Sequence, residues 1–126
     1  LTDTQEGLYI SARSLAKIAQ LFLQGGRWQN ENIIPAAWVE ESTAPHLATS
    51  AESDEAYGYL WWSHPYTYRE QKLTAHFGKG FGGQRPIFLP ELDLVIVLTG
   101  WNILPDQPFF TAMEAVERVT AALSED

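Results

Sequence analysis

The chain has 126 residues, of which 45% are hydrophobic and 13% aromatic, which is enough for one buried core and too little for two ordinary domains. Its formal net charge of −8 argues against a nucleic-acid or anionic-membrane partner, because phosphates attract Lys and Arg. Without cysteine it has neither disulfides nor Cys-ligated zinc, its three histidines lack metal-binding spacing, and no segment is apolar enough to span a membrane. No cofactor is expected, and the missing initiator Met and targeting signals suggest an excised piece of a longer protein.

The first quarter of the chain predicts a helix over residues 12–24. Ser11 is a suitable N-cap, apolar residues follow at helical spacing, and Gly25-Gly26 ends the pattern. Residues 27–32 form a turn-rich connector.

A second, short helix is predicted over residues 36–42. Pro35 suits its first position, and the residue before Pro45 disfavours helical geometry. Residues 44–56 are polar and predict a solvated loop.

From Tyr57 onward the aromatic and β-branched residues predict strands. The polar stretch 63–71 is interpreted as a turn or hairpin tip, and residues 90–93 as a short turn that makes the last two strands antiparallel neighbours. The four candidate strands are 57–62, 73–77, 84–89 and 92–99.

A final helix is predicted after the loop 100–107. Asp106 or Gln107 can cap it, with Pro108 in its first turn. One apolar stripe is expected to pack on the sheet: Phe109, Met113, Val116, Thr120 and Leu123.

The expected fold class is therefore α+β, an antiparallel sheet of three to four strands covered by helices. No composition shift or linker divides the chain, so residues 1–126 are expected to form a single partial domain.

Ser14 and Lys17 match S-x-x-K, the pattern of a serine nucleophile whose base is a lysine one helical turn away. Two fixed positions in four occur often by chance, and both residues flank the buried face of an ordinary amphipathic helix. We therefore favour a structural interpretation of this pair.

The glycine-rich run Gly78–Gly83 is the first candidate for the edge of a site. It lacks phosphate-loop spacing, but glycines beside a strand permit close approach of a ligand, and backbone N–H groups there can stabilise an oxyanion. His76 and Lys79 become candidates through their proximity to the run. His76 is either a structural histidine or a catalytic residue, and Lys79 is either a solvated lysine or a charge that binds a substrate carboxylate.

Four segments, taken together and in order, resemble the C-terminal part of the serine beta-lactamase-related superfamily. The closest branch is the class C-like one, which includes esterases, penicillin-binding-protein-like peptidases and 6-aminohexanoate-dimer hydrolases. The segments are Gly7–Ala16, Leu23–Trp28, Tyr57–Trp62, and Gly80–Gln84 with Leu89–Val95.

The resemblance implies a nucleophilic Ser and partner Lys, followed by a proton-transferring Tyr, all upstream of this chain. It also implies a third motif on the sheet strand that gives an oxyanion-hole N–H. That motif falls either near Ala75–Gly78 or near Lys79-Gly80, and neither register contains Lys-Thr-Gly. The positions carried over as catalytic are His76, Lys79, Gly78 and Gly80.

The expected parent protein is a serine hydrolase acting on a small-molecule amide or ester through an acyl-enzyme, and this chain alone is expected to be inactive. The alternatives are a non-catalytic binding or structural module, or a penicillin-recognising peptidase-like protein. By resemblance the parent would be periplasmic or extracellular. An open sheet edge is expected to favour homo-oligomers.

Overall fold

The computed structural model describes residues 8–104, 106 and 110–123, and these form an α+β fold. The expected fold class is confirmed. The helices are α1 (Ala12–Leu23), α2 (Ala36–Thr43) and α3 (Ala112–Ala122). A two-stranded sheet holds β1 (Arg27–Trp28) and β2 (Glu31–Asn32). The larger sheet holds β3 (Leu47–Ser50), β4 (Ser53–Tyr57), β5 (Trp62–Tyr68), β6 (Gln71–Phe77), β7 (Arg85–Leu89) and β8 (Leu94–Leu98).

Helix α1 begins and ends as its sequence predicts, to within one residue. The Ser14 N–H donates to the Ser11 Oγ over 3.1 Å, which satisfies one of the free donors of the first turn. At the other end the Gly26 N–H donates to the Leu21 carbonyl over 2.8 Å. Gly26 has φ +86° and a Cβ there would lie 2.1 Å from the Ile34 carbonyl oxygen, so only glycine fits.

The larger sheet is an antiparallel meander of six strands in the order β3-β4-β5-β6-β7-β8, rather than the three or four expected. The two additional strands come from the predicted loop 44–56, where β3 and β4 form a hairpin. Sequence patterning misses them because all four β3 residues are exposed, which removes the apolar–polar alternation that marks a half-buried strand.

Two other boundaries also differ from the prediction. The expected strand 57–62 is interrupted by a turn in which Leu60 has φ +67°, and Gly58 packs so closely that a Cβ would lie 2.3 Å from the Ser42 carbonyl oxygen. The expected turn 63–71 is mostly strand β5, and its tip is only Arg69-Glu70, both with positive φ. The β6, β7 and β8 strands confirm their predictions, and β7 pairs antiparallel with β8.

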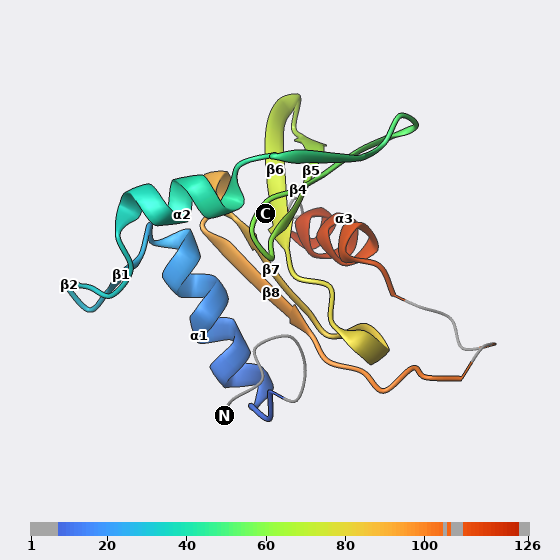
Figure 1. The fold of residues 1–126 in the computed structure, drawn as a ribbon. Coiled ribbons are helices and arrows are strands. Elements are labelled where there is room, and N and C mark those ends of the chain that lie inside the picture. Colours follow the sequence, from blue (N-terminus) through green and yellow to red (C-terminus); the bar gives the residue numbers. More distant parts are fainter. Residues whose placement is uncertain (1–7, 105, 107–109, 124–126) are drawn as a thin grey trace.

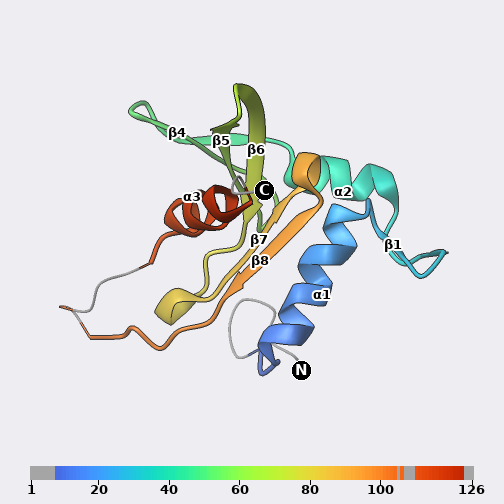
Figure 2. The ribbon, with the colours of Figure 1, turned by 180° about the vertical axis from the view of Figure 1, so that it is seen from behind.

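Each face of the β6-β7-β8 region packs against a different helix (Figures 1 and 2). Successive side chains of a strand point to opposite faces, so Ile87 and Leu89 join the core under α3 while Phe88 joins the core under α1. The α3-side core also contains Ala75, Phe77, Ile96, Ala112, Ala115 and Val116. On the α1 side Phe88 packs with Ala19 and Trp61.

Helix α3 begins later than predicted. Its N-cap is Thr111, whose Oγ1 accepts from the Glu114 N–H over 3.1 Å while the Glu114 carboxylate accepts from the Thr111 N–H over 2.8 Å. This capping box corrects the predicted cap at Asp106 or Gln107. Gln107, Pro108 and Phe109 lie outside the described residues. Val116 and Thr120 are buried as expected, whereas Leu123 is exposed.

Candidate functional site

The glycine-rich run connects β6 to β7. Its backbone hydrogen bonds use the N–H groups of Gly78 and Gly80, two of the positions that the sequence analysis gave as catalytic. The Gly78 N–H donates to the Pro86 carbonyl over 2.9 Å, and the Gly80 N–H donates to the Gln84 carbonyl over 2.8 Å. Both donors therefore point at β7 and are already satisfied, so neither is free to bind a ligand.

The N–H groups of Lys79 and Phe81 point the other way. Gly80 is extended, with φ −98° and ψ 150°, so donors on either side of it face away from β7. Strand β5 begins at Trp62, which pairs with Phe77, so this strand does not extend far enough to pair with Lys79 or Phe81. Within the described residues neither the Lys79 nor the Phe81 N–H donates to a backbone carbonyl, and Phe81 is the second residue of a tight turn that the Gly83 N–H closes by donating to the Gly80 carbonyl over 3.3 Å. Sequence reasoning passed over Phe81, although an aromatic between two glycines was a usable signal.

Side chains and a neighbouring loop hold this turn in place. The Arg85 guanidinium donates from Nη1 to the carbonyls of Gly80 and Gln84, 3.0 Å each. The Asn102 N–H donates to the Gly82 carbonyl over 3.0 Å, and the Gln84 side-chain amide donates to the Gly100 carbonyl. Gly82 has φ +75°, a conformation that favours glycine. The two N–H donors therefore sit on a braced backbone.

His76 lies on the α1 face of the sheet, where its ring stacks on Phe88 with 5.0 Å between centroids. Its Nδ1 is buried and has no hydrogen-bond partner among the described residues. Burial lowers the pKa of His76 below its usual value, and the Glu91 carboxylate opposes part of this shift. The imidazole is therefore neutral at pH 7. It borders a hollow of about 370 Å³ that is also lined by Asp54, Ser63, Thr74 and Glu91.

Lys79 lies on the opposite face. Its Nζ is 2.6 Å from the Glu55 Oε1 and 3.7 Å from the centre of the Trp62 ring, and Trp62 packs against the α3-side core. The ammonium is thus paired with a carboxylate and an aromatic face. The structure does not bring the side chains of His76 and Lys79 together, so they do not form one catalytic pair.

Ser14 and Lys17 are both exposed on α1. The Ser14 hydroxyl is 3.0 Å from the Ser11 hydroxyl, and Ser14 takes part in the helix cap. These contacts agree with the structural interpretation of this S-x-x-K sequence.

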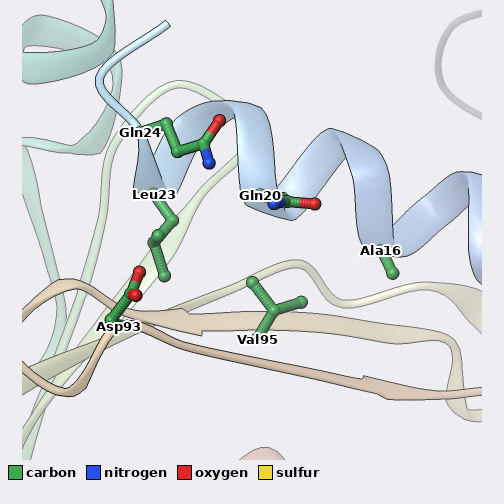
Figure 3. Close-up of a pocket in the computed structure, with 6 residues that line it drawn as sticks. All are labelled: Ala16, Gln20, Leu23, Gln24, Asp93 and Val95. Atoms are coloured by element: carbon green, nitrogen blue, oxygen red, sulfur yellow. The ribbon is translucent and has the colours of Figure 1, made fainter. Parts of the chain in front are cut away.

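A second hollow of about 320 Å³ lies at the seam between α1 and β8 (Figure 3). Leu23 points into it from α1 and Val95 from β8, and Ala16, Gln20, Gln24 and Asp93 complete its lining. It contains no Ser, His or Lys, and no residue of the glycine-rich run lines it. We regard it as a packing groove.

The described residues contain no group of three or more His, Asp or Glu side chains placed to hold a metal ion. No helix among them is long and apolar enough to cross a membrane.

The meander with a helix on each face is the α+β architecture of the beta-lactamase-like fold. No family model and no curated protein matches the chain. Among solved structures it is similar to a "putative 6-aminohexanoate-dimer hydrolase" from Bacillus anthracis, with a TM-score of 0.68 and 23% sequence identity. The match covers 94% of this chain and 29% of that one, so the chain spans less than a third of its structural neighbour.

Proposed function

We propose that this chain is the C-terminal part of a serine hydrolase that cleaves an amide or ester through an acyl-enzyme. The observation that carries the proposal is the pair of outward N–H donors at Lys79 and Phe81, on a braced turn at a strand end. The similarity in fold to a protein described as a hydrolase supports it. The nucleophile would lie N-terminal to this chain, in the proposed longer protein, which we call the parent chain.

In the proposed reaction an upstream Ser hydroxyl attacks the substrate carbonyl, and upstream Lys and Tyr side chains move its proton. The carbonyl oxygen becomes an oxyanion, and the Lys79 and Phe81 N–H groups donate to it. The tetrahedral intermediate then collapses, its C–N or C–O bond breaks, and the amine or alcohol leaves with the proton taken from Ser. Water then hydrolyses the acyl-enzyme, which releases the carboxylic acid and restores the Ser hydroxyl. Gly78 and Gly80 contribute through their backbone hydrogen bonds to Pro86 and Gln84, which fix the direction of these two donors. His76 contributes a neutral ring beside the hollow that Asp54 and Glu91 help to line, and the Lys79 ammonium forms an ion pair with Glu55.

The oxyanion role is tested in the parent chain with proline variants, because proline removes the backbone N–H donor, and it fits where φ near −65° and an extended preceding residue are tolerated. Phe81→Pro suits the backbone, since Gly80 is already extended and Phe81 is the second residue of the tight turn 80–83, a position where proline is common. We expect kcat for a nitrophenyl ester to fall roughly 10²–10³-fold in Phe81→Pro, in Lys79→Pro, or in both. The matched variants Phe81→Ala and Lys79→Ala keep the N–H and should retain kcat for nitrophenyl acetate, whose acyl chain is short, within a few-fold. Thermal melting checks that all four variants fold. Proline variants that fold and match their alanine controls would contradict the proposal.

The nucleophile is tested on the 126-residue chain itself, assayed with a chromogenic cephalosporin and a nitrophenyl ester. We expect no turnover, with Ser14→Ala indistinguishable from wild type. Turnover that disappears in Ser14→Ala would instead make Ser14 and Lys17 the catalytic pair.

A further inference from the structure

An exposed apolar surface lies beside the two N–H donors. The side chains of Phe81 and Trp101 are 81% and 73% exposed, and those of Leu104 and Ile103 are 60% and 44% exposed. We call these four residues the apolar rim. Phe81 belongs to the turn before β7, and the other three follow β8, so both segments lie at the same end of the sheet (Figure 1). Exposed apolar surface in continuous patches is characteristic of binding sites.

Backbone contacts hold the two segments of the rim together. The Asn102 N–H donates to the Gly82 carbonyl, and a Cβ placed on Gly82 would lie 3.6 Å from the Trp101 Cα. Phe81 directly precedes Gly82, and Trp101 directly precedes Asn102, so both aromatic residues are next to this backbone contact. Residues 80–84 and 100–104 contain no charged side chain, which favours a neutral, apolar occupant.

We infer that the apolar rim binds the apolar acyl chain of the substrate, so that the parent enzyme prefers medium- or long-chain acyl groups to short ones. This inference rests on the proposed function. Phe81 connects the two parts of the site: its N–H faces the reacting carbonyl and its ring begins the rim, so a carbonyl held at the donor directs its chain along the rim. Each methylene buried there strengthens binding about fourfold.

The test compares nitrophenyl acetate with nitrophenyl decanoate in the parent chain. In Trp101→Ala we expect kcat/KM for decanoate to fall about tenfold and that for acetate to stay within twofold. Trp101→Phe should restore most of the decanoate rate. Trp38→Ala is the matched control, since Trp38 is an exposed Trp on α2 that lies outside the rim, and it should leave the ratio of the two rates unchanged.

Equal losses on both esters, or no change on either, would overturn the inference while leaving the proposed hydrolase intact. If the parent chain hydrolyses neither ester, nor the matching nitroanilide amides, the proposed function fails. Binding of 1-decanol, measured by calorimetry, then tests the rim separately. Binding weakened about tenfold in Trp101→Ala supports the rim, and unchanged binding overturns it. A change of molecular mass in Trp101→Ala by light scattering would identify the rim as a protein interface and would also overturn it.

Discussion

Burial of the His76 imidazole favours its neutral form, and this effect outweighs the opposing charge of Glu91. Its ring stacks on Phe88, its Nδ1 is buried, and burial lowers its pKa despite the nearby Glu91 carboxylate. The unfolded chain therefore binds a proton at His76 below about pH 6.5, where the folded chain still does not. Because the unfolded state holds more protons, the free energy of unfolding falls as the pH drops from 6.5 towards the lowered pKa.

We predict that His76→Phe removes this part of the pH dependence. Phenylalanine keeps the stacking on Phe88 and leaves no buried nitrogen without a partner, so the variant should unfold with a flatter stability profile between pH 7 and pH 5. Urea unfolding at several pH values, followed by fluorescence, measures it. The wild-type chain, measured in the same buffers, is the reference for the slope. Parallel profiles for His76→Phe and wild type would contradict the prediction.

Among the elements, those whose apolar residues recur at a regular spacing could be predicted from the sequence, whereas β5 and the β3–β4 hairpin could not. The α1 helix and the β6, β7 and β8 strands have apolar residues at the spacing that their packing requires. The β3–β4 hairpin has no buried face of its own, and it forms because backbone pairing continues the sheet beyond β5. The two N–H groups that we propose as oxyanion donors could be located only in part from the sequence. The sequence indicated the glycine-rich run, but which N–H groups remain free depends on the register with β7.

The start of α3 depends on the Thr111–Glu114 capping box, and we predict that Thr111→Ala destabilises the chain by about 1 kcal/mol. The variant removes the acceptor for the Glu114 N–H, whereas Thr111→Ser keeps it and should cost a few tenths of that amount. Chemical unfolding of both variants gives the comparison. Equal stability of Thr111→Ala and Thr111→Ser would argue against the cap as the start signal of this helix.

At the scale of the whole molecule the two edges of the sheet differ. The β3 edge is exposed and irregular, with a register shift between Ala48 and Ser50, and such irregularities discourage pairing with another chain. The β8 edge consists of five apolar residues, Leu94–Leu98, and within the described residues it pairs only with β7. An edge of this kind is open to another strand.

We predict that the 126-residue chain by itself dimerises through β8. Light scattering over a range of concentrations should give a mass above that of one chain. Val97→Lys places a charge on that strand and should restore the monomer. Leu47→Lys, on β3, should leave the mass unchanged. A monomer at every concentration in the wild-type chain would contradict the prediction.

The position of β7 between two cores has a consequence for local unfolding. Its amides lie between two neighbouring strands and under helices on both faces, so they are released only when the whole domain opens. Those of β3 have one neighbour and no cover, and small fluctuations suffice to free them. Deuterium should therefore enter the sheet from the β3 end and reach β7 last, so that the braced turn between β6 and β7 is anchored to the slowest-exchanging strand.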